Sequence, residues 1–185
     1  VGTRDALVQT AESLMRTKGY AAFSYADLAE TVGIRKASIH HYFPTKEDLG
    51  TAIIENHLVR MQDDFDCIER QHQDVIARLG AFTRRFQASS DGGLLPLCGA
   101  LAAEMSALPS GLQQLTHRFF DMQLTWLTRI LEQGIGRGEI PCGCGARQKA
   151  FLLLSALEGS SLINWATKGQ DFLNDRTTRL IVEEA

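Results

Sequence analysis

Long hydrophobic runs are missing from this chain of 185 residues. No segment approaches the roughly twenty consecutive apolar residues that a membrane-spanning helix needs, and no charged-then-apolar secretion signal is visible. The sequence also lacks a Walker loop, a dinucleotide-binding glycine pattern, a nucleophile elbow and a pair of histidines one helical turn apart. These absences argue against a membrane protein and against an enzyme. We therefore expect a cytoplasmic, non-catalytic chain that needs neither a cofactor nor a metal.

Cysteine occurs only four times, at positions 67, 98, 142 and 144. In a cytoplasmic chain these thiols are expected to be reduced rather than paired in disulfides. Cys142 and Cys144 flank a single glycine, which suits a redox or soft-metal pair, but no nearby histidine or further cysteine completes a metal site. Cys98 lies at the start of a short predicted helix, where a thiol gains reactivity. The alternative for Cys98 is a small apolar packing residue.

The alternation of β-branched and polar residues that indicates strands is absent as well. Apolar residues recur instead at intervals of three and four, the period of an amphipathic helix. The sequence therefore predicts an all-α fold. After residue 45 the expected helices span about 46–71, 73–88, 97–108, a long segment from 109 or 110 to the glycines that begin at 134, 146–167 and 170–184.

Acidic residues are missing from one segment, although they are in slight excess overall. Taken alone, the formal net charge of −3 argues against a nucleic-acid partner, because the neutralisation of phosphates dominates the affinity for DNA. Between Gly33 and Lys46, however, the chain has three cationic residues and no Asp or Glu. The acidic excess lies elsewhere, where it would limit non-specific binding.

The segment from residue 24 to residue 42 has the pattern of a helix-turn-helix. Ser24 and Asp27 have the spacing of a capping box, which predicts that a short helix begins there. Gly33 supplies the permissive residue of a tight interhelical turn. A second helix over about 36–42 then presents small or polar side chains that can approach base edges closely, while Ile39 anchors it inward.

A third helix is expected to follow at once. Pro44 ends the preceding helix, and Thr45 with Asp48 repeats the capping-box spacing. The free backbone N–H groups at this start, together with Lys46, are placed to hold a phosphate. The alternative is a small helical subdomain whose aromatic residues are core and whose charges are merely solvated.

This part of the sequence resembles the TetR family of one-component bacterial regulators. The resemblance covers about the first fifty residues and beyond them rests on helix order and length alone. His40 departs from the family, which more often has a tyrosine there. The resemblance implies a three-helix, helix-turn-helix DNA-binding domain over residues 1–47 and a helical ligand-binding and dimerisation domain over residues 48–185. It is carried by residues 11–20, 23–29, 32–33, 37–38 and 41–49.

The residues expected to contact operator DNA lie on or beside the motif. Tyr, His and Lys side chains are phosphate donors, and small side chains allow close approach to bases. We predict sequence-specific binding to double-stranded DNA. The candidate contacts are Ser24, Tyr25, Lys36, Ala37, Ser38, His40, His41, Tyr42, Thr45 and Lys46.

The remaining helices carry many large, adaptable apolar side chains. Such residues at helical spacing usually form core, but several could instead line an apolar cavity for a small effector. Glu104, His117, Gln123 and Asn164 are polar groups that could orient it. The candidate effector contacts are Phe65, Phe82, Phe86, Cys98, Met105, Phe119, Met122, Trp126 and Trp165.

The predicted helix over 146–167 is apolar on several faces and contains small residues that allow close helix approach. In the TetR family two such helices pair with their copies and set the spacing of two recognition helices on a palindromic operator. The alternative is a helix at the centre of the monomer. The candidate dimer contacts are Phe151, Ser155, Gly159, Leu162, Phe172 and Leu180.

These expectations combine into one functional hypothesis. The resemblance implies a homodimeric transcriptional regulator, and we expect a repressor that a small apolar effector releases from its operator. A redox or electrophile sensor acting through the thiol of Cys98 is one alternative. A helical binding or scaffolding protein without DNA recognition is another.

Overall fold

The computed structural model describes residues 2–90, 94–169 and 173–184. Over these ranges the regular structure is entirely helical and contains no strand, so the all-α prediction is confirmed. Among the helices of these ranges, none combines the length and the apolar character needed to cross a membrane. The elements are α1 (Thr3–Lys18), α2 (Tyr25–Val32), α3 (Lys36–Tyr42), α4 (Lys46–Gln71), α5 (Val75–Ser90), α6 (Leu97–Ala103), the 3-10 turn η1 (Met105–Ala107), α7 (Ser110–Gly136), α8 (Ala146–Thr167) and α9 (Asp175–Glu184).

The chain divides into two compact units. The first unit comprises Val1–Arg60 and Leu97–Phe119, and the second comprises Met61–Pro96 and Phe120–Ala185. Helices α4 and α7 each begin in the first unit and continue into the second. The sequence predicts a functional boundary after residue 47, between a DNA-binding domain and a ligand-binding and dimerisation domain. This boundary differs from the division into compact units and stays a prediction.

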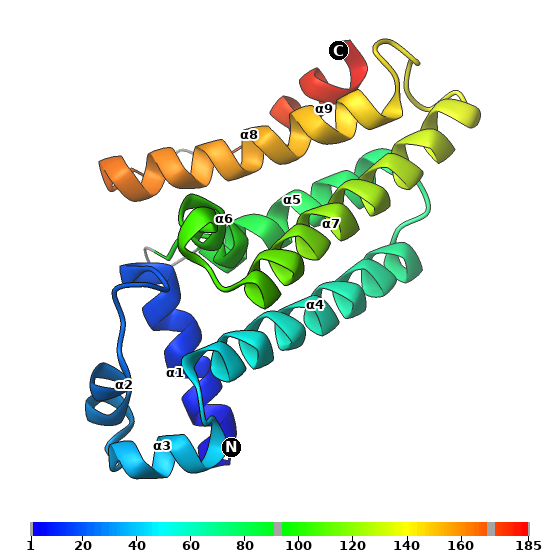
Figure 1. Ribbon diagram of the computed structural model, residues 1–185. Coiled ribbons are helices and arrows are strands. Elements are labelled where there is room, and N and C mark those ends of the chain that lie inside the picture. Colours follow the sequence, from blue (N-terminus) through cyan, green and yellow to red (C-terminus); the bar gives the residue numbers. More distant parts are fainter. Residues whose placement is uncertain (1, 91–93, 170–172, 185) are drawn as a thin grey trace. The chain divides into compact units, whose positions relative to one another are not determined.

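In the first unit α2 packs against both α1 and α3 (Figure 1). Leu7, Ala11 and Met15 recur every four residues of α1 and are almost fully buried, as the amphipathic period requires. Ile39 of α3 and Leu49 of α4 are buried as well. Because Ile39 fixes the inward face of α3, the other face of this short helix is turned to solvent.

In the second unit the core is built on an aromatic cluster. The ring of Phe65 on α4 stacks on Trp126 of α7, with ring centroids 4.5 Å apart and an interplanar angle of 7°. Phe82 of α5 lies 5.5 Å from Trp126, centroid to centroid. The indole N–H of Trp126 donates to Glu69 at 2.8 Å, so the polar edge of the ring is satisfied.

Helices α5, α8 and α9 also pack together in the second unit. Lys149 of α8 is fully buried, and its ammonium donates to the carbonyl oxygen of Val182 in α9 at 2.8 Å. The hydroxyl oxygens of Thr83 on α5 and Thr178 on α9 lie 3.4 Å apart. These polar contacts hold α9 against α5 and α8, because the folded protein is destabilised when a buried polar group is separated from its hydrogen-bond partner.

Three of the predicted helices, α3, α4 and α8, have the expected limits, and α5, α6 and α9 differ. Helix α5 spans Val75–Ser90 rather than the predicted 73–88, and near its end the hydroxyl of Ser89 donates to the carbonyl oxygen of Phe86 at 2.6 Å. Helix α6 ends at Ala103 rather than at 108, because the N–H of Glu104 bonds to the carbonyl oxygen of Leu101, three residues back, and a 3-10 turn over Met105–Ala107 follows. Helix α9 begins at Asp175 rather than at the predicted position 170, because the side chain of Asn174 accepts the N–H of Thr177 at 3.1 Å. Residues 170–172 lie outside the described part.

Candidate functional site

The start of α2 is fixed by the predicted capping box. The backbone N–H of Ser24 donates to the carboxylate of Asp27 at 2.7 Å, and the N–H of Asp27 donates to the hydroxyl of Ser24 at 3.3 Å. The hydrogen bonds from Ser24, with Lys18 nearby, hold the pKa of Asp27 well below its usual range. At the other end Gly33 has φ +76°, the left-handed conformation that an interhelical turn uses. The prediction of a helix-turn-helix is therefore matched by its local geometry.

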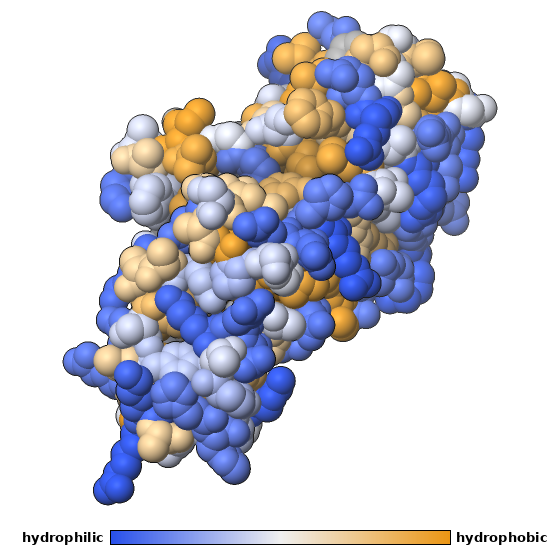
Figure 2. Space-filling view, viewed as in Figure 1, coloured by the Kyte–Doolittle hydropathy of each residue, from blue (hydrophilic) through white to orange (hydrophobic). Residues whose placement is uncertain are grey.

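Helix α3 presents an almost continuous exposed face. Its side chains are exposed except for that of Ile39, and Tyr42 is 41% exposed. The surface over α2 and α3 is predominantly hydrophilic on the face seen in Figure 2. Six of the predicted DNA contacts thus lie on this one short helix. They are Lys36, Ala37, Ser38, His40, His41 and, at its end, Tyr42.

Tyr25 has a structural role in this motif. Its ring is buried, and its hydroxyl donates to the carbonyl oxygens of Phe43 and Thr45 at 2.9 and 2.6 Å. Burial raises its pKa to about 12. The ring also lies 4.9 Å from that of His40, centroid to centroid. Tyr25 therefore joins the start of α2 to the end of α3, and its phenol is already bonded within the protein.

Lys46 also turns toward the protein. Thr45 and Asp48 form the expected capping box, with the N–H of Thr45 donating to the Asp48 carboxylate at 2.9 Å. The ammonium of Lys46 donates to the carbonyl oxygen of Phe23 at 2.5 Å and lies 4.6 Å from the centre of the Tyr20 ring. Burial lowers the pKa of Lys46. The residue thus stabilises the loop between α1 and α2, and a phosphate contact by Lys46 stays a prediction.

Glu104 makes a contact that no local sequence pattern predicts. Its carboxylate accepts the backbone N–H of Tyr20 at 2.5 Å and that of Ala21 at 3.3 Å. Gly19 allows this approach, because it has φ +90° and a Cβ added there would lie 2.9 Å from both carboxylate oxygens. Glu104 was expected to orient an effector. In the structure it binds the loop between α1 and α2 to the segment that follows α6.

Two glycine substitutions are expected to differ in cost, because Gly19 (φ +90°, ψ 159°) has a conformation nearly restricted to glycine and lies close to Glu104, whereas Gly33 (φ +76°, ψ 33°) does neither. We expect Gly19→Ala to destabilise the protein by about 2 kcal/mol or more, because it adds a contact with the Glu104 carboxylate to the strain of a left-handed alanine. Gly33→Ala should cost only about 1 kcal/mol, since a Cβ there meets no atom within 4 Å. Urea denaturation measures both, with Gly136→Ala as the unstrained control. Equal losses at positions 19 and 33 would contradict the role given to Glu104.

Four of the six predicted dimer contacts, Phe151, Ser155, Gly159 and Leu162, lie on α8. Phe151 and Leu162 are more than half exposed, and apolar atoms gather over α8 in Figure 2. Ser155 is exposed, and a Cβ on Gly159 would meet nothing within 4 Å. Leu180 of α9 is 54% exposed. Phe172 lies outside the described residues.

The predicted effector contacts are divided between the two units. Phe65, Phe82 and Trp126 form the aromatic cluster of the second unit, and Phe86 lies beside Phe82. Met122 is half-buried, whereas Trp165 on α8 is 38% exposed. The other three residues of the set, Cys98, Met105 and Phe119, belong to the first unit.

The second unit contains two buried polar atoms that have no hydrogen-bond partner among the described residues. They are the amide nitrogen of Gln123 on α7 and one carboxylate oxygen of Glu158 on α8. Gln123 is only 2% exposed, and burial raises the pKa of Glu158 to about 7. Gln123 was among the residues expected to orient an effector. Glu158 was missed, since a lone acidic residue in an apolar helix has no distinctive sequence pattern.

Comparisons with known proteins agree with this geometry. Residues 7–53 match the family model described as bacterial regulatory proteins, tetR family. The chain is 25% identical to the HTH-type transcriptional repressor NemR of Escherichia coli K12 over 140 residues, which are 74% of this chain and 68% of that protein. A TetR-family transcriptional regulator of Agrobacterium tumefaciens has a similar solved structure, with a TM-score of 0.85, 29% identity and coverage of 98% of this chain and 94% of that one. For a TetR regulator of Legionella pneumophila the TM-score is 0.86, the identity 26% and the coverage 98% and 96%.

Proposed function

Because the chain belongs to the TetR family of transcriptional regulators, we propose that it is a repressor that binds a palindromic operator as a homodimer and is released by a small molecule. The exposed face of α3, held in place by Ile39 and Tyr25, is the observation that carries the DNA-binding part. Its small side chains suit close approach to base edges in the major groove. Chromosomal DNA lies in the bacterial cytoplasm, where we expect the protein to act.

The role of Lys36 can be tested by salt dependence. We expect Lys36→Ala to weaken binding to operator and random DNA alike, because an exposed lysine beside the recognition face contacts phosphate rather than bases. The plot of the logarithm of the association constant against the logarithm of the salt concentration should become less steep, by about one in slope for each protomer. Arg70→Ala, which removes an exposed charge from the second unit, is the matched control. An unchanged slope for Lys36→Ala would contradict a phosphate contact.

The apolar face of α8 supports the homodimer. A continuous exposed patch of large apolar side chains is uncommon on a monomer and favours an interface. Phe151, Ser155, Gly159 and Leu162 recur at intervals of four, four and three, which places them on one face of the helix. The small residues between the two large ones allow a copy of the same helix to approach closely.

We place the effector in the second unit. Its interior is mostly apolar, yet it buries the Gln123 amide nitrogen and a Glu158 carboxylate oxygen that find no hydrogen-bond partner within residues 61–90, 94–96, 120–169 and 173–184 of this unit. Such atoms lose several kcal/mol of hydration unless another group bonds to them. A small molecule with an apolar body and a hydrogen-bonding group would supply those partners and gain orientation from them.

The chain itself offers a route for coupling between the two units. Helices α4 and α7 run through both, and α4 begins directly after the loop that follows α3. An effector that binds better to one arrangement of these helices shifts the population toward it by its difference in affinity. Within the first unit, the hydrogen bond from the loop before α2 to Glu104 connects the helix-turn-helix motif to the end of α6.

A thiol sensor acting through Cys98 is the second candidate. Cys98 lies on α6, the helix that ends just before Glu104, and an adduct on its thiol would displace that helix. Cys98 is fully buried, however, so reagents should reach it slowly. We expect brief treatment with N-ethylmaleimide to leave operator affinity unchanged. If the wild type released the operator and Cys98→Ser did not, the sensor would be the better account.

A further inference from the structure

The loop between α7 and α8 holds two cysteines in one tight turn. The N–H of Gly145 donates to the carbonyl oxygen of Cys142 at 2.8 Å and closes a turn over residues 142–145. Gly143, between the two cysteines, has φ +50°, a conformation that glycine adopts without strain. The backbone therefore holds Cys142 and Cys144 two residues apart in a fixed turn.

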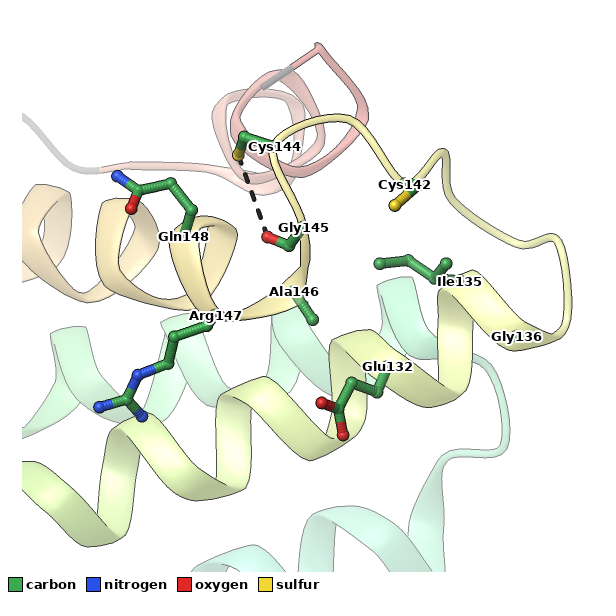
Figure 3. A pocket seen from close by; sticks show the side chains of 9 residues that line it. All are labelled: Glu132, Ile135, Gly136, Cys142, Cys144, Gly145, Ala146, Arg147 and Gln148. Atoms are coloured by element: carbon green, nitrogen blue, oxygen red, sulfur yellow. Dashed lines mark hydrogen bonds between the residues drawn. The ribbon is translucent and has the colours of Figure 1, made fainter.

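Both thiols are exposed, are in no disulfide and line the same open pocket of about 590 Å³. Figure 3 shows Cys142 on the side of Ile135, at the end of α7, and Cys144 on the side of Gln148, at the start of α8. The sulfur of Cys144 lies 3.9 Å from the carbonyl oxygen of Gly145. Because neither side chain is packed in the core, rotation about the Cα–Cβ bonds can turn both sulfurs toward one bound atom.

The atoms that this pocket offers for coordination restrict the chemical class of ligand that can bind there. In the described ranges no group of three or more His, Cys, Asp or Glu residues could hold a metal ion, so these residues do not form the four-ligand set of a tetrahedral zinc site. Two thiols remain as soft donors. They suit a thiophilic centre that needs only two sulfur ligands from the protein.

We propose that Cys142 and Cys144 form a capture site for trivalent organoarsenic compounds. In the reaction the arsenic–oxygen bond of an arsine oxide breaks, the two thiol S–H bonds break and two arsenic–sulfur bonds form. The oxide oxygen leaves with both protons as water, and neither arsenic nor sulfur changes its oxidation state. Once the first bond forms, the second is intramolecular and is favoured by the high effective concentration within the turn.

The other cysteines lack this arrangement. Cys67 on α4 is half-buried, Cys98 on α6 is fully buried, and each is the only cysteine of its helix. A single thiol forms one arsenic–sulfur bond, which competing monothiols exchange readily. The chelate is therefore specific to residues 142 and 144, and it does not depend on the effector proposed above.

Intact-mass spectrometry of the full, reduced protein treated with phenylarsine oxide tests this site. After a wash with excess 2-mercaptoethanol, we expect one phenylarsenic group to remain on each chain and to be removed by 2,3-dimercaptopropanol. Cys142→Ser and Cys144→Ser should each lose the retained group, whereas Cys67→Ser should keep it. Both key positions are exposed, so thermal melting should confirm that the serine variants remain folded.

Either of two results would overturn the proposal. One is retention of the arsenic group by Cys142→Ser or Cys144→Ser, which would place the adduct elsewhere. The other is its complete loss from the wild type in 2-mercaptoethanol, which would show that the two thiols do not chelate.

Discussion

Ser38→Glu should reduce operator affinity by about 100-fold or more, because it places a carboxylate on the exposed face of α3 in each protomer. An unfavourable contact at a base edge costs about 1–3 kcal/mol, and the dimer makes it twice. Electrostatic repulsion by the phosphates adds to this loss. Fluorescence anisotropy with a labelled operator measures the affinity.

The fold should tolerate this substitution. The side chain of Ser38 is exposed, and the backbone N–H that closes the turn with Arg35 is unaffected by the change. Ser13→Glu, at an exposed position of α1, adds the same charge to the same unit and is the matched control. We expect it to change affinity by no more than a few fold. Similar losses in the two variants would mean that net charge, rather than contact by α3, governs the binding.

The second large effect is expected at the face of α8. Leu162→Glu should convert the dimer to a monomer, because two carboxylates would be buried at the interface without a counter-charge. A cost of about 3 kcal/mol raises the dimer dissociation constant more than a hundredfold. Analytical ultracentrifugation measures the association, and operator affinity should fall with it because each half-site then binds alone.

Val59→Glu is the matched control for this change. Val59 is 62% exposed on α4, compared with 54% for Leu162, and it lies in the first unit. The substitution makes the same kind of change at a surface that we do not assign to the dimer. A dimeric Leu162→Glu variant, or a monomeric Val59→Glu variant, would show that the dimer interface lies elsewhere.

Local sequence patterns explain why the motif could be predicted closely. The capping boxes at Ser24 and Thr45 and the turn at Gly33 involve residues at most a few positions apart. Their hydrogen bonds depend on spacing that can be read from the sequence directly. The start of α9 was harder to predict, because a single Asn174 cap decides it and no glutamate or glutamine completes a capping box.

The roles of individual side chains were less predictable, because they depend on contacts between distant residues. Glu104 binds a backbone N–H that is 84 residues away in sequence. Tyr25 and Lys46 have the chemistry of phosphate donors, yet both polar groups bond to backbone carbonyl oxygens of the motif. The unpartnered oxygen of Glu158 likewise becomes evident only when α8 is packed in the second unit.

The central claim is sequence-specific operator binding by a dimer. The most direct test is selection of genome fragments by the purified protein, followed by gel-shift titration of the recovered sites at two salt concentrations. We expect recovery of one inverted repeat that is bound by a dimer and is preferred over random DNA at both salt concentrations. Recovery of only unrelated fragments that dissociate at moderate salt would contradict this claim.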